Sequence, residues 1–398
     1  MSVNGPSNNW LVPFAGLIAA TFAVCTAELV ISGLLPSIAN DLHVDIPTAG
    51  QLITGYAIGV GVAGPLLALA TAGVSRKTVL ISIMAAFVIG NILCALSGSY
   101  WMLLASRLLL AGCHGLFFGV AIVLATQLAP PGRQASAVSL VLAGVNAATI
   151  LGVPLGTAIG NAYGWRAPFW ITAVAGVFAA VVLVLLLRND GAPPRTDRSQ
   201  FERELRAAVR PKVLLGYATI AFTFVAFFVM VSYLVPLLTN VSSIPLDQVP
   251  WVLFAMGLAG FVGNLAGGRI SDHYPLVTII GSLGINIILL VLLAQIVTSS
   301  VLTPVLLCLI WFIGFFFPAP VQARILKEVA DAPNFTSTIM GSSFQVGIAS
   351  GAALGGAVLA AGWGYERLPL LSALFMVLSL ICTLGLVTWD RLARRALA

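Results

Sequence analysis

Residues 11–36 read LVPFAGLIAATFAVCTAELVISGLLP. A stretch of about 20 consecutive apolar residues can cross the hydrocarbon core of a bilayer as a helix. This run is long enough, so it predicts a transmembrane helix and places Glu28 at membrane depth. Among the acidic residues of the chain, only Glu28 falls in the interior of a span that we predict, away from its ends.

Glu28 is the first candidate functional residue. An ionised carboxylate inside a membrane costs at least about 2.5 kcal/mol, so Glu28 needs a partner or a proton. Burial disfavours the charged form, which suits a group that binds and releases protons. The alternative is a Glu held ionised by a buried Arg that only joins two helices. Intramembrane ionisable residues are functional by default, so we favour the first interpretation.

The composition identifies a polytopic membrane protein. Hydrophobic residues make up 60% of the 398 positions and charged residues 8%, whereas about a quarter of the residues of a soluble domain are charged. The net charge of +6 comes from bases in short loops, which orient membrane spans and give no reason to expect a nucleic-acid partner. The five cysteines lie in apolar runs and do not form a disulfide pattern. The first apolar run is too long for a signal peptide, so we expect it to be retained.

Apolar runs predict twelve transmembrane helices in two groups of six. The first group covers residues 10–35, 46–71, 77–97, 101–128, 134–160 and 165–187, and the second covers residues 213–239, 249–270, 275–297, 302–326, 335–361 and 366–388. Between them, residues 188–212 form a charged linker with a short surface helix predicted from Phe201 to Val209. We therefore expect an amino-terminal bundle (1–187), a cytoplasmic linker and a carboxy-terminal bundle (213–398).

The basic residues predict the orientation. With the amino terminus in the cytoplasm, only Arg166 and Arg367 of the loop bases lie outside. The cytoplasmic bases are Arg76, Lys77, Arg133, the bases of residues 188–212, Arg269, Arg324, Lys327, Arg391, Arg394 and Arg395. The positive-inside rule then places both termini in the cytoplasm.

An offset of 199 residues reveals an internal repeat. It aligns Gly64 with Gly263, Gly115 with Gly314, Asn146 with Gln345, Gly152 with Gly351 and Gly156 with Gly355. Two parallel six-helix repeats predict a transporter whose site lies between the halves. The same offset places Glu28 opposite Phe227 and Arg107 opposite Leu306, so the first half should hold the coupling chemistry.

Arg107 and His114 are the other charged candidates inside the first half. Counted along their helices, Glu28 and Arg107 lie at similar depth and can meet if the two helices are neighbours. Arg107 then either pairs with the carboxylate as a switch or bonds helix backbone for packing. His114, two turns deeper, either relays a proton or serves as an interhelical hydrogen-bond donor.

Small residues recur at every fourth position of the fifth span, at Ala148, Gly152, Gly156 and Gly160, and Pro154 should bend that helix. The eleventh span repeats the register at Gly347, Gly351 and Gly355. Such registers allow close helix approach. We expect packing seams, which also slide if they lie between the halves.

The second half supplies aromatic side chains where the first half supplies charged ones. Together with amide side chains, they predict a substrate cavity. The candidate lining residues are Tyr56, Asn146, Phe224, Phe227, Phe228, Tyr233, Asn264, Trp311, Phe315 and Gln345. Such a lining suits a moderately apolar molecule with a few polar groups.

The sequence motifs of known enzymes give no support for an enzymatic function. Residues 59–64 match GxGxxG but lie inside a predicted helix without a preceding strand, so the dinucleotide interpretation fails. No P-loop, HExxH or GxSxG occurs, and we expect no metal site and no enzyme. A membrane enzyme or receptor is a remote alternative, since only Glu28, Arg107 and His114 could form its polar cluster.

The chain resembles the drug:proton antiporter branch of the major facilitator superfamily. The stretches TAELVISGLLPSIANDL, SRLLLAGCHGLFFG, GVPLGTAIGNAYGWR and GNLAGGRISD carry the resemblance, which covers nearly the whole chain and is greatest to bacterial sugar, purine and chloramphenicol exporters. It implies an all-α fold of two six-helix bundles, a role for Arg107 in proton coupling, and an antiporter motif that includes Gly152, Pro154 and Gly156.

One loop departs from the family pattern. TAGVSRK has Ala72 where the family usually carries an Asp, although Arg76 and Lys77 are present. The matching loop GGRISDH keeps Asp272, so a cytoplasmic charge lock would depend on Arg269 and Asp272.

These observations predict a proton-coupled antiporter that exports a small amphipathic compound or drug by alternating access. Export of a native metabolite such as a sugar or nucleobase is the alternative. We expect a monomer in the bacterial cytoplasmic membrane, with lipid, protons and a small-molecule substrate as partners and the proton gradient in place of a cofactor.

Overall fold

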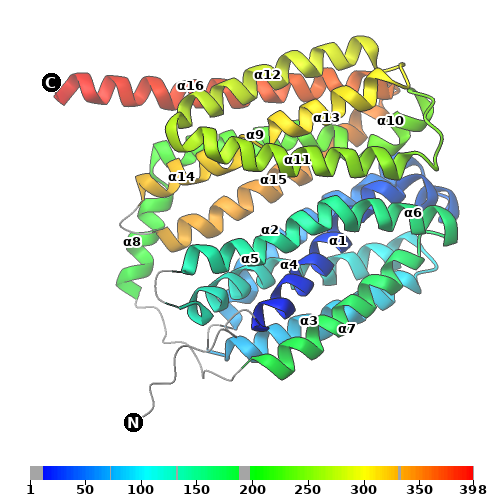
Figure 1. Ribbon diagram of the computed structural model, residues 1–398, viewed down its shortest axis with the longest axis horizontal. Coiled ribbons are helices and arrows are strands. Elements are labelled where there is room, and N and C mark those ends of the chain that lie inside the picture. Colours follow the sequence, from blue (N-terminus) through cyan, green and yellow to red (C-terminus); the bar gives the residue numbers. More distant parts are fainter. Residues whose placement is uncertain (1–11, 72, 131–132, 188–197, 330–332, 398) are drawn as a thin grey trace.

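The computed structural model describes residues 12–71, 73–130, 133–187, 198–329 and 333–397, and every regular element in these ranges is a helix (Figure 1). The elements are α1 (Val12–Asp41), α2 (Ile46–Ala70), α3 (Arg76–Ala95), α4 (Tyr100–Leu128), α5 (Gln134–Ala147), η2 (Ala148–Gly152), α6 (Val153–Tyr163), α7 (Ala167–Leu186), α8 (Arg198–Ala208), α9 (Pro211–Val231), α10 (Leu234–Asn240), α11 (Val249–His273), α12 (Pro275–Ile296), α13 (Leu302–Gly314), α14 (Pro318–Glu328), α15 (Pro333–Ala360), η3 (Tyr365–Arg367) and α16 (Leu368–Leu397).

Twelve of the described segments are long and apolar enough to cross a membrane, as the sequence predicted. The chain is therefore a multi-pass membrane protein. The short helix α8 lies in the charged linker and begins three residues before the predicted surface helix.

Three of the twelve spans are interrupted, and each interruption lies beside a proline. A π-helical turn, η2, separates α5 from α6 just before Pro154. The breaks between α9 and α10 and between α13 and α14 come before Pro236 and Pro318. Proline cannot donate the intrahelical hydrogen bond and its ring clashes with the preceding turn, so the helix ends or unwinds there.

The helices form two bundles that lie side by side in Figure 1, with α1–α7 in one and α9–α16 in the other. Each bundle has its own buried apolar cluster. Figure 1 shows α8 and the end of α16 at one end of the molecule, which we call the α8 end. The opposite end, which holds α10, we call the far end.

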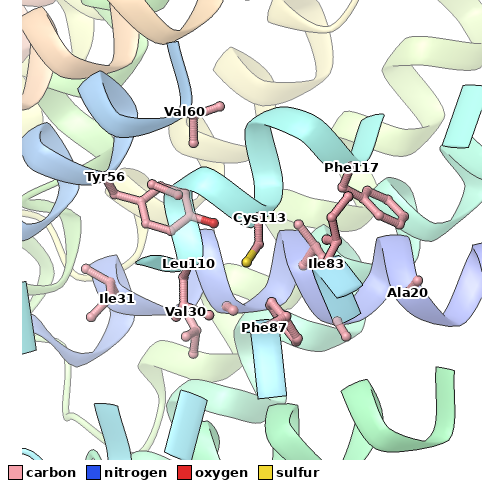
Figure 2. Packing of buried hydrophobic residues seen from close by; sticks show 14 of the residues in the cluster. Ala20, Val30, Ile31, Tyr56, Val60, Ile83, Phe87, Leu110, Cys113 and Phe117 are labelled. Atoms are coloured by element: carbon pink, nitrogen blue, oxygen red, sulfur yellow. The ribbon is translucent and has the colours of Figure 1, made fainter. Parts of the chain in front are cut away.

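The interior of the first bundle is close-packed. Figure 2 shows Tyr56 and Val60 of α2 facing Leu110 and Cys113 of α4. Glycines let these two helices approach: a Cβ on Gly64 would lie 2.9 Å from the carbonyl oxygen of Gly115. At the equivalent place in the repeat, Gly263 of α11 faces the carbonyl of Phe312 in α13, so the two bundles share this packing.

The small-residue seam of the fifth span lies inside one bundle, so in this conformation it packs two helices of the first bundle and does not lie between the halves. A Cβ on Gly152, Gly156 or Gly160 would meet Thr26, Val30 or Leu34 of α1. In the second bundle, Gly347, Gly351 and Gly355 of α15 likewise face α9. Both registers hold pairs of helices that belong to the same bundle.

Two hydrogen bonds from side chains join the bundles toward the far end. Asn161 Nδ2 donates to the Leu246 carbonyl at 3.2 Å, and Thr54 Oγ1 donates to the Ala349 carbonyl at 3.4 Å. At another contact between the bundles, Gly257 of α11 fits against the backbone of Thr149 in η2. In Figure 1 the ribbons of the two bundles diverge toward the α8 end.

Candidate functional site

Glu28 lies in the middle of α1 and points its carboxylate toward two other helices. Its Oε2 is 3.6 Å from His114 Nδ1 of α4, and its Oε1 accepts from Gln345 Nε2 of α15 at 3.5 Å. The side chain is 14% exposed. A carboxylate at membrane depth thus contacts both bundles and remains partly accessible.

Arg107 binds the backbone beside Glu28. Its side chain is fully buried, and the guanidinium donates to the carbonyls of Ala27 at 2.5 Å and Glu28 at 3.3 Å. The guanidinium carbon also lies 4.2 Å from the ring centroid of Tyr56, a cation–π distance. Of the two roles that the sequence left open, the geometry is that of backbone bonding, and Arg107 Nε has no hydrogen-bond partner among the described residues.

His114 continues the polar contacts from Glu28 into the first bundle. Its Nδ1 is 3.2 Å from the Tyr56 hydroxyl, and its ring lies 5.3 Å from that of Phe118. Depending on the tautomer, Nδ1 either accepts from the Tyr56 hydroxyl or donates to it or to Glu28. The Glu28 carboxylate and the Tyr56 hydroxyl thus approach the same ring nitrogen of His114, and the three side chains form one polar cluster.

Gln345 is the member of the site that comes from the second bundle. Its amide nitrogen donates to Glu28, while its Oε1 is buried without a partner among the described residues. A Cβ on Gly61 of α2 would lie 3.5 Å from the Gln345 Cβ, so α2 packs closely beside it. Gln345 therefore has one free acceptor at a place where Glu28 could become a donor.

A small cavity opens beside these groups. It is lined by Glu28, Leu29, Ser32, Ile53, Tyr56, Arg107, Phe228 and Ile348. Its empty space of about 280 Å³ includes space open to solvent, so the enclosed part is far smaller than a pocket that holds a drug-sized molecule. A substrate larger than this cavity would therefore require a conformation in which the site is wider.

Several predicted cavity residues lie elsewhere. Phe227 packs edge-on to Trp311 with centroids 5.5 Å apart, and Phe315 faces Gly260, so these three half-buried rings contact residues of the second bundle. Tyr233 is fully buried near the far end. Asn146 and Asn264 are half-buried on α5 and α11 and do not line the cavity. These six residues therefore do not line the cavity beside Glu28, and their part in a substrate cavity stays a prediction.

Of the predicted cavity residues, Tyr56, Phe228 and Gln345 lie at Glu28, and Phe224 lies close by, with its ring 6.4 Å from that of Phe228 in a stacked arrangement. The sequence analysis missed Leu29, Ser32, Ile53 and Ile348. Helical spacing could have found the last three, because each lies three or four residues from a predicted site residue on its own helix.

The charged residues at the α8 end form contacts within each bundle. Arg76 donates to Gln127 Oε1 at 2.8 Å, and Lys77 Nζ donates to the last carbonyls of α7. Arg269 and Asp272 are exposed on α11, and the structure forms no ion pair between them. A cytoplasmic charge lock that depends on Arg269 and Asp272 stays a prediction.

No group of His, Cys, Asp or Glu side chains among the described residues has the arrangement of a metal site. The carboxylate, imidazole and phenol at Glu28 offer proton transfer and hydrogen bonding instead.

Two bundles of membrane-spanning helices around one intramembrane polar site define a membrane transporter. The chain belongs to the Major Facilitator Superfamily, whose family model matches residues 17–341. It is a transporter and not an enzyme.

Comparisons with known proteins agree. The chain is 34% identical over 369 residues to the inner membrane transport protein YdhP of Escherichia coli K12, covering 93% of this chain and 94% of that one. It is 29% identical over 371 residues to a protein of Pasteurella multocida named a probable sugar efflux transporter, covering 93% and 90%.

The fold also matches a crystal structure of a bacterial homolog of the human lysosomal transporter Spinster, described as inward-facing and unoccupied. The TM-score is 0.66 with 13% sequence identity, over 96% of this chain and 99% of that one.

Proposed function

We propose that the chain is a proton-coupled antiporter that exports a small amphipathic compound, with Glu28 as the residue that binds and releases the proton. The observation that carries this proposal is the carboxylate of Glu28 itself. It lies in a membrane span, borders a cavity, and contacts His114 and Gln345 on opposite bundles. A group that contacts both bundles can transmit its protonation state to their relative position.

The Gln345 amide suits both protonation states of Glu28. An ionised carboxylate accepts from Nε2, as in this conformation. A protonated carboxyl group becomes a donor, and the unpartnered Oε1 of Gln345 is an acceptor that a flip of the amide would present to it. Protonation thus exchanges one hydrogen bond between the bundles for another, and the difference in their strength can favour one access state.

The lining of the cavity supports an amphipathic substrate. Its apolar surface comes from Leu29, Ile53, Phe228 and Ile348. Polar contacts come from Ser32, Glu28 and Arg107. Such a mixture suits a compound with an apolar body and few polar groups. A sugar is the second candidate, favoured by the similarity to the Pasteurella protein.

We also propose that the α8 end faces the cytoplasm of a bacterial inner membrane. Bases concentrate in the loops and the linker at that end. YdhP is named an inner membrane protein, and the matched solved structure is described as inward-facing. Close contacts toward the far end are consistent with an inward-open conformation of this chain as well.

The test is a flux measurement in liposomes that contain the purified protein and a pH-sensitive dye. Candidate substrates are added in turn from three classes: amphipathic antibiotics, sugars and nucleobases. For the true substrate, we expect wild-type protein to move protons against the substrate flux. Glu28→Gln should abolish that proton movement and keep substrate binding measurable.

The matched control is Glu366→Gln, because Glu366 is an exposed glutamate in η3 and does not line the cavity. It should transport like wild type. Undiminished pH-dependent transport by Glu28→Gln would contradict the proposed role of Glu28. A response to sugars alone would replace the amphipathic substrate with the second candidate.

A further inference from the structure

Tyr233 occupies the break between α9 and α10. Its backbone leaves the helical conformation (φ −118°, ψ 21°), which turns the side chain inward, and the residue is fully buried. The hydroxyl donates to the carbonyl of Ala352 in α15 at 2.9 Å. A buried tyrosine with its hydroxyl satisfied is held in one position.

Three glycines make room for this side chain. A Cβ on Gly355 would lie 2.8 Å from the Tyr233 ring, and one on Gly356 would lie 2.5 Å from its hydroxyl. A Cβ on Gly50 would lie closer still to the same hydroxyl oxygen. Carbon atoms do not approach oxygen or ring carbon this closely without displacement, so the three positions form a socket that fits Tyr233 only as glycine.

The socket is built from both bundles. Gly355 and Gly356 belong to α15, which packs on α9 in the same bundle as Tyr233. Gly50 lies in the second turn of α2, in the other bundle. One turn further along α2, the hydrogen bond from Thr54 to Ala349 also joins the bundles. If the bundles separate at the far end, Tyr233 keeps its contacts with α15 and loses the one with Gly50.

We propose that Tyr233 is the gating residue of the far end, and that the hydroxyl seated on Gly50 is the contact that closes it. Opening this end requires the hydroxyl to leave Gly50, while the Tyr233 ring stays on Gly355 and Gly356. The size of residue 50 therefore sets the balance between the two access states. This proposal depends on the separation of the bundles during transport and does not depend on proton coupling or on the identity of the substrate.

The experiment measures the opening of the far end directly. Spin labels are placed by Trp101→Cys at the start of α4 and Trp251→Cys at the start of α11, which are 75% and 72% exposed at the far end of opposite bundles. The five native cysteines are replaced beforehand. The distance between the labels is recorded in liposomes without substrate or pH gradient, so the result does not involve Glu28.

Gly50→Ala is the informative variant and Gly61→Ala is its matched control. Both add one methyl group to α2 on the side that faces α15, but at Gly61 the nearest atom would be 3.5 Å away, an ordinary contact. We expect Gly50→Ala to shift the ratio of open to closed far ends toward open by about fivefold or more. Gly61→Ala should match wild type.

Tyr233→Phe provides a second test, because it removes the atom nearest Gly50 and the bond to Ala352 but keeps the ring. Alone, it should also shift the labels toward the longer distance, and it should partly restore closure in Gly50→Ala. Equal distance distributions in Gly50→Ala and Gly61→Ala would overturn the proposal. If Gly50→Ala does not reach the membrane, an unchanged distribution in Tyr233→Phe would overturn it equally.

Discussion

Arg107 lies against Glu28 but bonds its backbone carbonyl, at 3.3 Å, while the Glu28 carboxylate faces His114 and Gln345. This arrangement would ease the proton exchange that we propose for Glu28. Breaking a buried ion pair costs about 3 to 5 kcal/mol, and a carboxylate paired with Arg107 would meet that barrier whenever it took up a proton. Backbone bonding leaves the positive charge near Glu28 and keeps the carboxylate available.

Arg107→Ala should therefore impair proton-driven transport more than Arg107→Lys. Lysine keeps the buried charge but lacks the planar group that contacts two carbonyls and lies over the Tyr56 ring. Because hydrogen bonds to charged groups contribute about 1.5 to 3 kcal/mol, we expect Arg107→Ala to lose about tenfold or more in transport rate and Arg107→Lys to be intermediate. Flux in liposomes measures both, and wild-type rates in both variants would leave Arg107 without a role in coupling.

Gln345→Leu tests the contact between the bundles at the site. Leucine has a similar size and cannot bond Glu28 in either protonation state. A hydrogen bond contributes about 1 kcal/mol, so substrate accumulation driven by a proton gradient should fall by about fivefold. Substrate binding, measured by equilibrium dialysis, should change much less.

The control for this variant is Gln295→Leu, since Gln295 is exposed on α12 and away from the cavity. If both glutamine variants accumulate substrate equally, the hydrogen bond across the bundles does not contribute to coupling.

Hydropathy was enough to predict the twelve spans, because each must be a long apolar helix to satisfy its backbone in lipid. Counting residues along α1 and α4 also predicted that Glu28 and Arg107 lie near each other. It could not predict which atoms meet. That choice depends on the rotation of each helix about its axis, which packing in three dimensions decides.

The glycine registers show the same limit. Spacing predicted a close approach along Gly152, Gly156 and Gly160, and the approach exists. The sequence could not identify the partner helix, because a small-residue face fits any neighbouring helix equally well on sequence grounds. The place of Tyr233 could not be predicted for a related reason: the sequence of an apolar span does not distinguish an aromatic residue that lines a cavity from one that fills a socket of glycines.

Asp45 allows a test of what stabilises the start of α2, the helix that carries Gly50. Its carboxylate accepts a hydrogen bond from the backbone N–H of Thr48 at 2.8 Å, as a helix N-cap does. The hydrogen bonds from Thr48 hold the pKa of Asp45 below its ordinary value. A lowered folded-state pKa means that this stabilisation is present above the unfolded pKa of about 3.9 and is lost as the pH falls through the folded value.

Asp45→Ala should therefore lower the thermal stability at pH 7 by about 0.5 to 2 kcal/mol, with the difference from wild type shrinking below about pH 4. Thermal denaturation in detergent across this pH range measures the effect. Asp45→Asn is the control, because asparagine caps helices equally well and does not titrate. An equal pH response in Asp45→Asn and wild type would remove Asp45 as the cause.

Gly156→Val tests whether the seam of the fifth span slides during transport or holds one bundle together. A Cβ on Gly156 would lie 2.5 Å from Cγ2 of Val30 in α1, and both helices belong to the first bundle. The clash should therefore be present in both access states. We expect a loss of about 1 to 3 kcal/mol in stability, with transport falling only in proportion to the amount of folded protein.

Thermal denaturation and flux per folded molecule separate the two possibilities. Val30→Ala removes the atom that obstructs the new side chain, so Gly156→Val with Val30→Ala should recover stability. Gly281→Val is the control, since nothing lies within 4 Å of a Cβ there. If Gly156→Val instead keeps wild-type stability and binds substrate from one side only, the helix pair must rearrange between states, and the first bundle does not move as a rigid body.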